Sequence, residues 1–283
     1  MRRVTYYPHT REEILSQSPI RPMSRTNKLC FLFLVFSPAC VAVSEPPKVD
    51  AELQVYSQHV FRGVSQTDGK VVQARNDWTL DLGEGQSFTL GSFVNVDGTN
   101  ETGDGIYPDG NGGQVTRVEF EPTWAWDLGG EILSAGVVNR SHPNNVGYGD
   151  TTEAVLAWYP GFQLMNYQPM MKFYYDLEDG DGLYSQFGIS RRYEMSADLR
   201  LETSFDLSHA DSDQAENLYR IDRAGFGDLT AQAVLRWKRP SHLEITASIA
   251  ASAIVSNHLG ESLEADGLDD TNLWLGVGMS WAF

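Results

Sequence analysis

The stretch Asn272-Leu-Trp-Leu-Gly-Val-Gly-Met-Ser-Trp-Ala-Phe283 alternates between two kinds of side chain. One set is wholly apolar and ends in two aromatic residues: Leu273, Leu275, Val277, Met279, Trp281 and Phe283. The other set is small or polar, apart from Trp274. A period of two is that of a β-strand whose faces meet different surroundings. In water this strand would expose aromatic rings and aggregate, whereas in a bilayer its apolar face would meet lipid. We expect a membrane-barrel strand; the last strand of a soluble sandwich or lipocalin-like barrel is the alternative.

The N-terminal region reads as an export signal. The apolar run 29–43 follows two basic residues and ends in a small-x-small cleavage pattern. It is shorter than the ~20 residues that a membrane helix needs. We expect a start at Met23 and cleavage after Ser44. Residues 1–44 would then be an upstream extension plus a cleaved signal peptide, and residues 45–283 an outer-membrane β-barrel.

The chain is acidic, with a formal net charge of −17. This charge argues against nucleic acid and anionic lipid as electrostatic partners. Both cysteines, Cys30 and Cys40, lie in the signal region, so we expect no disulfide in the exported part. Lipid attachment at Cys40 is a minor alternative, because the residues before it fit a lipoprotein signal poorly.

Strand-like segments recur along the rest of the chain, with turn residues between them. They are 51–61, 70–81, 86–97, 115–126, 131–141, 150–160, 167–176, 183–192, 198–208, 228–238, 242–255 and 271–283. A strand crosses a bilayer in about 9–11 residues. We therefore predict an all-β fold, a closed antiparallel transmembrane β-barrel of about 12 strands. Pro122 cannot donate to a ladder and should mark a bulge.

Charged residues fall on one face of several segments. In 198–208, Leu201 and Phe205 alternate with Arg200 and Glu202. A polar face toward the lumen and an apolar face toward lipid are typical of membrane barrels. The residues that we expect to line the lumen are Arg75, Asp77, Arg117, Glu119, Glu121, Glu153, Lys172, Arg200, Glu202, Asp206, Arg236 and Glu244.

The connections between the segments alternate in length. One set is short: 82–85, 127–130, 161–166, 193–197 and 239–241. The interleaved set is mostly longer and acidic: 62–69, 98–114, 142–149, 177–182, 209–227 and 256–270. Short turns at one end and long loops at the other are how outer-membrane barrels are built. Near the short turns lie five tryptophans, typical of an interfacial girdle: Trp78, Trp126, Trp158, Trp237 and Trp281.

The first strand runs into Val60-Phe-Arg-Gly-Val-Ser-Gln-Thr-Asp-Gly-Lys70. This segment resembles the opening motif of the TorF family of proteobacterial outer-membrane porins. The matching positions are Val60, Phe61, Arg62, Gly63, Ser65, Gln66, Thr67 and Asp68. His59 stands where the family often has Tyr, and the loops 98–114 and 209–227 are longer than we expect of shorter members. The resemblance implies a porin-type barrel and no known substrate.

The motif residues themselves suggest a strand top with tight turns at Gly63 and at Asp68-Gly69. Arg62 would then point into the lumen, pair with loop acids or simply be solvated. At the other end of the chain, Trp281 and Phe283 resemble the terminal assembly signal of outer-membrane barrels.

Enzyme and metal sites have little support in the sequence. Neither Gly-x-Ser-x-Gly nor His-Glu-x-x-His occurs after the signal, so we expect no catalytic residues and no cofactor. The stretches 97–109 and 176–182 are rich in Asp, Asn and Gly, but neither fits the spacing of an EF-hand. We therefore assign no metal ligands and take these stretches as acidic surface loops.

We expect a porin of the Gram-negative outer membrane, with a narrow water-filled channel for passive diffusion of small solutes. Its partners would be outer-membrane lipid and lipopolysaccharide, small solutes, and the barrel-assembly machinery through the C-terminal strand; no nucleic acid is expected. The alternative is a surface β-barrel with a plugged lumen, whose acidic loops bind an ion or a partner. A barrel enzyme is a third hypothesis.

Overall fold

The computed structural model describes residues 46–283 apart from 101–102, 104, 145–148, 179–181 and 241. The expected signal peptide and its cleavage site lie outside the described residues. Neither of the described helices is long and apolar enough to cross a membrane.

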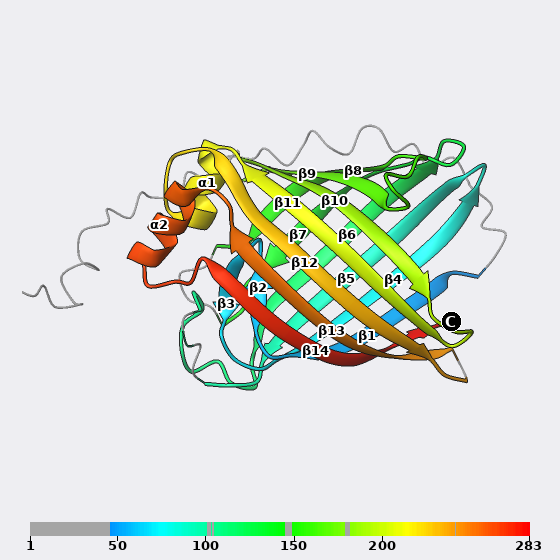
Figure 1. The fold of residues 1–283 in the computed structure, drawn as a ribbon, viewed down its shortest axis with the longest axis horizontal. Coiled ribbons are helices and arrows are strands. Elements are labelled where there is room, and N and C mark those ends of the chain that lie inside the picture. The colour runs from blue at the N-terminus through cyan, green and yellow to red at the C-terminus, as the bar shows by residue number, and fades with distance from the viewer. Residues whose placement is uncertain (1–45, 101–102, 104, 145–148, 179–181, 241) are drawn as a thin grey trace, which may run out of the picture. The chain divides into compact units, whose positions relative to one another are not determined.

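Twelve strands form one closed antiparallel barrel, as predicted (Figure 1). They are β1 (Lys48–Tyr56), β4 (Val71–Gly83), β5 (Gln86–Asp97), β6 (Val115–Asp127), β7 (Ile132–Ser141), β8 (Thr151–Tyr159), β9 (Gln168–Asp176), β10 (Leu183–Glu194), β11 (Leu199–Ala210), β12 (Gly225–Lys238), β13 (Leu243–Ile254) and β14 (Thr271–Ala282). Neighbours along this list pair with each other, and β14 closes the ring on β1. Closure leaves no strand edge with unpaired backbone groups, which lipid would not tolerate.

The two faces of the barrel strands differ as the alternation predicts. On β14, Leu273, Leu275 and Val277 are exposed on the outside, with Val277 60% exposed, whereas Asn272 and Gly276 are buried. Exposed apolar residues follow the outer faces of other strands too: Leu53, Val72, Phe120, Leu156, Phe187, Phe205, Leu229 and Ile249. An apolar outer surface on a closed barrel is what a bilayer stabilises.

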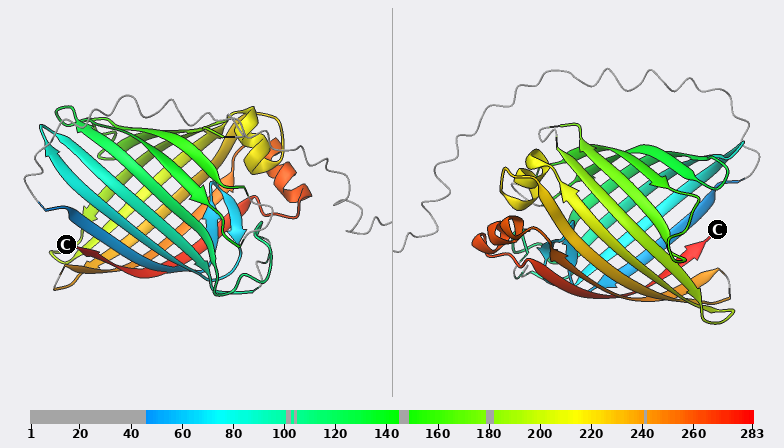
Figure 2. Two further views of the ribbon diagram at one scale, coloured as in Figure 1. Left: turned by 180° about the vertical axis from the view of Figure 1, so that it is seen from behind. Right: turned by 45° about the horizontal axis from the view of Figure 1, so that its top comes forward.

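The barrel has a turn end and a loop end. The turn end carries the connections 84–85, 128–131, 160–167, 195–198 and 239–242, together with the C-terminus. The loop end carries 57–70, 98–114, 142–150, 177–182, 211–224 and 255–270. Figure 2 shows two further views, in which two helices cluster at the loop end.

The first loop departs from the predicted strand 51–61. The barrel strand β1 already ends at Tyr56, and the chain then forms a separate hairpin of β2 (His59–Phe61) and β3 (Val64–Thr67). The alternation of apolar and polar residues in β1 stops at Ser57-Gln58-His59, and Val60 and Phe61 are two consecutive apolar residues, so the predicted strand extends past the point where the pattern ends.

Two helices also lie outside the prediction, which contained none. They are α1 (Ser212–Tyr219) and α2 (Asn257–Ala265). The Asp211 side chain caps α1 by accepting a hydrogen bond from the backbone N–H of Gln214. Each helix is only about two turns long, too short for its apolar spacing to stand out in the sequence.

Pro122 does not produce the predicted bulge. The pairing of β6 with β7 skips Glu121 and Pro122, and the register is the same on both sides of this gap, from Phe120↔Asn139 to Thr123↔Gly136. The missing N–H therefore interrupts the ladder without shifting it.

Candidate functional site

The hairpin of β2 and β3 turns through only two residues, Arg62 and Gly63. Both have positive φ, 51° and 79°, as a type I′ turn requires. A Cβ added to Gly63 would lie 2.5 Å from the Cβ of Asp228, so the close packing also demands glycine. Arg62 is strained in this left-handed region, and its side-chain contacts must offset the strain.

The hairpin lies inside the barrel, because its partners come from strands around the wall. Asn272 of β14 donates to the Gly63 carbonyl at 2.9 Å. Thr67 donates to the Asp97 carboxylate of β5 at 3.2 Å. With Asp228 of β12 against its tip, the hairpin touches three separate sectors of the ring.

The Arg62 side chain forms a buried ion pair with Glu153 of β8. Two hydrogen bonds of 2.8 and 2.7 Å join them, and the two side chains are 6% and 3% exposed. The guanidinium carbon lies 4.2 Å from the ring centre of Tyr184 and 5.0 Å from that of Tyr174. Burial alone would lower the pKa of Arg62, but the Glu153 carboxylate outweighs it and raises that pKa.

The ion pair continues into a network on the neighbouring strands. Arg140 of β7 contacts both Glu153 and Glu119, and Arg117 of β6 also contacts Glu119. The guanidinium carbon of Arg117 lies 3.8 Å from the centre of the Phe61 ring at the hairpin tip. Ion pairs and cation–π stacking therefore hold the hairpin against the barrel wall at one place.

A small apolar core holds the hairpin from the loop end. Its buried residues come from the hairpin, the wall and both helices: Val64, Tyr184, Ala210, Ala215, Tyr219, Leu259 and Leu263. The Tyr219 hydroxyl donates to the Arg62 carbonyl at 3.2 Å. The hairpin, α1 and α2 thus pack as one unit.

His59 of the hairpin is buried beside other titratable groups. Burial, and then the positive charge of Arg117, lowers the pKa of His59 from 6.5 to about 3. Its ring lies edge-on to Tyr107, 5.9 Å between centres, and Glu119 and His142 also act on it. At neutral pH this imidazole is therefore uncharged.

A second ion-pair network occupies the turn half of the interior. Glu202 of β11 contacts Arg192, Arg200 and Arg236 at 3.2, 3.0 and 2.8 Å. Arg200 forms two further hydrogen bonds of 2.9 Å with Glu244 of β13. These side chains come from β10 to β13 and converge, so they point to the inside of the ring.

The opposite wall carries a smaller charge group. Arg75 of β4 contacts Asp77 at 2.9 Å and Glu121 of β6 at 3.4 Å. Lys172 lines a cavity together with these three side chains and forms no ion pair among the described residues. Asp206, likewise without an ion pair in the described part of the chain, lies beside the hairpin.

The interior is hollow on both sides of the hairpin. Three cavities in the turn half have volumes of about 470, 380 and 520 Å³. The two cavities that adjoin the hairpin are smaller, about 250 and 240 Å³. The cavities are therefore larger toward the turn end than beside the hairpin.

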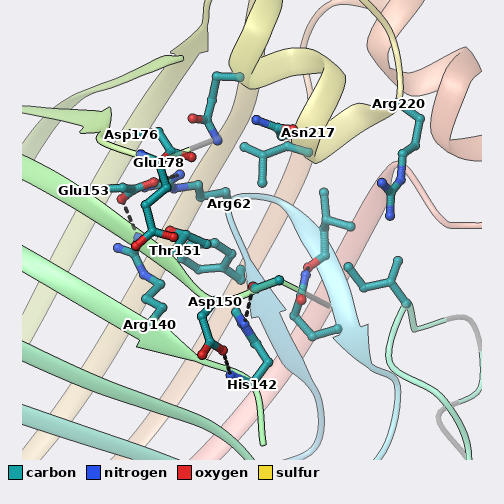
Figure 3. A pocket seen from close by; sticks show the side chains of 17 residues that line it. Arg62, Arg140, His142, Asp150, Thr151, Glu153, Asp176, Glu178, Asn217 and Arg220 are labelled. Carbon is teal, nitrogen blue, oxygen red and sulfur yellow. Dashed lines mark hydrogen bonds and ion pairs between the residues drawn. The ribbon is translucent and has the colours of Figure 1, made fainter. Parts of the chain in front are cut away.

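The 250 Å³ cavity opens toward the loop end, and we call it the mouth cavity (Figure 3). Its walls include Asp150, Asp176 and Glu178 from the wall and loops, and Asn217 and Arg220 from the region of α1. Figure 3 shows the Arg62, Arg140 and Glu153 side chains deep in the same view.

Ten of the twelve residues proposed from the sequence for the lumen border these interior cavities. The other two are Glu119, which pairs with the cavity residue Arg140, and Arg117, which pairs with Glu119. The structure adds Arg140, Arg192 and Glu52, which the sequence analysis did not assign to the lumen. Of the alternatives left open for Arg62, it shows a side chain directed into the ring and paired with Glu153. Arg192 alternates in step with Gln186 and Ser190 of β10, so the alternation there held a usable signal, whereas Asn139, Arg140 and Ser141 of β7 are consecutive polar residues that hide the face of Arg140. Trp281 and Phe283 lie at the turn end, and Phe283 is 77% exposed.

No family model matches the chain, and no curated protein matches it. Among solved structures, the COG4313 outer membrane channel from Pseudomonas putida F1 is similar over 88% of this chain and 100% of that one, with a TM-score of 0.51 and 9% identity. The KdgM porin is similar over 83% of this chain and 99% of that one, with a TM-score of 0.44 and 11% identity. At these identities the likeness shows the fold alone: a membrane-type antiparallel β-barrel.

Proposed function

We propose that this chain is an outer-membrane channel of porin type, through which small polar solutes diffuse passively. The observation that carries the proposal is the hollow, charged interior of a closed barrel whose outer face is apolar. A charged lining stabilises water and ions in the lumen, and an apolar outer face is stable in contact with lipid. The printed name of the similar Pseudomonas protein, an outer membrane channel, agrees with this proposal.

The hairpin sets the width of the path in this proposal. It carries the motif that resembles the TorF family, and we propose membership of that family on those residues. Phe61, Arg62 and Gly63 form its tip, which explains in physical terms why the motif joins an aromatic, a cation and a glycine. The chemistry would be passage without bond making, with no catalytic residue and no cofactor.

We further propose export with cleavage of residues 1–44, residence in the outer membrane among lipid and lipopolysaccharide, and recognition of β14 by the barrel-assembly machinery. The apolar outer face and the aromatic residues Trp281 and Phe283 at the turn end support this location.

A plugged surface barrel is the second candidate, and the hairpin favours it. A buried Arg62–Glu153 pair and an apolar core hold the hairpin inside the ring. If the hairpin stays inside the barrel and seals the lumen, no solute passes. The loops, rather than the lumen, would then carry the function.

Recording from the refolded chain in a planar bilayer separates the two candidates. Discrete conductance steps that scale with salt support the channel. A heat-modifiable, correctly folded barrel that gives no steps at any voltage would reject the channel and support the plug.

A further inference from the structure

The largest of the five cavities described above, with a volume of about 520 Å³, lies in the turn half of the barrel and has an excess of positive charge. Among the described residues that line it, three are arginines, Arg191, Arg192 and Arg236, and one is a carboxylate, Glu202. In the other two cavities of the turn half, with histidine counted as neutral, the basic and acidic residues number five against five and two against three. Of the three cavities, this one should therefore attract an anion.

The carboxylate of Glu202 is too widely shared to cancel this charge. It contacts Arg192, Arg200 and Arg236 at 3.2, 3.0 and 2.8 Å. Arg200 and Arg236 each have a second carboxylate partner, and Arg191 lies over two tyrosine rings, 4.5 and 5.7 Å from their centres. Arg192 has no second carboxylate partner among the described residues, and its side chain is 60% exposed. Part of its fork of N–H donors is therefore free for a ligand in the cavity.

The rest of the lining suits a solute with hydroxyl groups. Gln163 and Asn166 of the turn 160–167 and Gln232 of β12 line the cavity, and their side chains form no hydrogen bond with another described residue. An amide side chain has both donors and an acceptor, so it can pair with a hydroxyl, which is itself a donor and an acceptor. The described lining contains no aromatic ring and one aliphatic side chain, Val234, which gives an apolar solute little to contact.

We propose that this cavity is a binding subsite for small hydroxylated carboxylates, the chemical class of the sugar acids. Arg192 binds the carboxylate, because a planar guanidinium matches two carboxylate oxygens. Gln163, Asn166 and Gln232 bind the hydroxyl groups. A volume of about 520 Å³ is typical of a site for a small organic molecule. The inference rests on the proposed channel, since it names a class of solute that the channel holds on its way through.

The acids of the mouth cavity do not oppose this binding. They lie at the loop end, whereas the subsite lies in the turn half. Charges in contact with water are screened within about 8 Å at physiological salt. The mouth acids therefore act on entry from the loop end, and binding in the turn half depends on the lining of that cavity.

Gluconate is the probe, and two simpler molecules separate its chemical features. Sorbitol has a similar chain of hydroxyl groups without the charge, and acetate has the carboxylate without the hydroxyl groups. Saturation-transfer NMR titrations of the refolded full chain in detergent measure binding without any need for conduction. We expect gluconate to bind severalfold more tightly than either sorbitol or acetate.

Two variants of the cavity test the two halves of the site. Arg192→Gln removes the charge and keeps a hydrogen-bonding group, and the barrel should still fold because this side chain is mostly exposed. We expect it to weaken gluconate binding about fivefold, as the loss of one exposed ion pair does, and to leave sorbitol binding unchanged. Gln232→Ala should weaken the binding of both gluconate and sorbitol about twofold to threefold.

The matched control is Arg223→Gln. It removes the same charge from an exposed residue of the loop 211–224, outside the cavity, and should leave the binding of all three probes unchanged. The shift in gel mobility on heating shows whether each variant has folded. If Arg192→Gln does not fold, the order of the three probes on the unchanged protein still decides, because any order without gluconate first overturns the proposal.

The outcomes separate the subsite from the channel. Weaker gluconate binding in Arg192→Gln but not in Arg223→Gln supports the subsite, whether or not the protein conducts. Channels that conduct but bind no gluconate, or bind it equally in both variants, overturn the subsite and leave the channel standing. Acetate that binds as tightly as gluconate would show a general anion effect and reject the hydroxylated class.

Discussion

Arg62 combines two unfavourable features, a left-handed backbone and a charge removed from water. Its contacts with Glu153 and the tyrosine rings are what offset them. A buried ion pair is weak evidence for net stability, but breaking one by removing a single partner leaves an uncompensated charge. The Arg62–Glu153 pair therefore contributes more to the placement of the hairpin tip than to the net free energy of unfolding.

We predict that Arg62→Ala or Glu153→Gln alone lowers the free energy of unfolding by about 3–5 kcal/mol, and that the double variant costs clearly less than the sum. Arg62→Ala should also raise the single-channel conductance, because it removes the side chain from the narrow part. Urea unfolding of the refolded barrels and bilayer recording measure both. The control is Arg192→Ala, whose side chain is mostly exposed, and it should cost under about 1 kcal/mol. Additive costs would show that Arg62 and Glu153 do not act as a pair.

His59 should make the docked hairpin sensitive to acid. Its pKa is about 3 in the fold against 6.5 when free, so the stability that it contributes is complete above pH 6.5 and is lost as the pH falls toward 3. Each pH unit in that window should cost about 1.4 kcal/mol. Since carboxylates of the protein titrate in acid as well, the informative quantity is the difference from His59→Gln, which cannot titrate. Free energies of unfolding of the two proteins should converge or cross between pH 6.5 and 4; parallel curves would contradict the assignment.

The strands are the elements whose two faces the sequence already separates. On β11, Phe205 is 45% exposed on the outer face, whereas Ser204 borders the interior cavity of about 520 Å³. We predict that Phe205→Arg destabilises the barrel by roughly 2–4 kcal/mol in a bilayer, because it places a charge in lipid. Ser204→Arg places the same side chain one residue away, in water, and should change stability little. Unfolding in lipid vesicles measures both, and equal costs would mean that the register is wrong by one residue.

Sequence reasoning reached the strands because each repeats one simple alternation over many residues. It did not reach the hairpin, since no proline or glycine marks the end of β1 and the local signal is only the polar run Ser57-Gln58-His59 before the apolar pair Val60-Phe61. The partner of Arg62 lies 91 residues away, so the Arg62–Glu153 pair depends on the closed ring rather than on local pattern. The same holds for α1 and α2, whose apolar residues pack against one another, against Val64 of the hairpin and against the barrel wall, all far apart in the sequence.

Closure of the ring depends on its two terminal strands. Val49 and Phe283 exchange backbone hydrogen bonds of 3.2 and 2.9 Å at the turn end, and Phe283 is exposed. We predict that Phe283→Asp leaves protease-sensitive, unassembled chain, because a charge replaces the aromatic group at the lipid interface. Phe283→Tyr, which keeps an interfacial aromatic ring, should assemble. The shift in gel mobility on heating reports assembly, and a normal heat-modifiable barrel from Phe283→Asp would refute the role of this side chain.

The charge balance of the whole molecule predicts a weak preference for cations. Inside the barrel, the arginines and carboxylates largely pair with one another, so the lumen itself is close to neutral. Among the described residues, some acids without an ion pair, such as Glu84, lie in turns at the turn end. Others lie at the loop end, in the mouth cavity and along α2. Their field should concentrate cations at the entrance within about 10 Å at 0.1 M salt and within about 3 Å at 1 M. In a salt gradient, the reversal potential should therefore indicate cation preference that fades as salt rises.

Neutralising Asp150 and Glu178 should shift the reversal potential toward anion preference, whereas Glu84→Gln in a turn at the other end should not. Anion selectivity of the wild-type channel would place the controlling charges in the arginine networks instead.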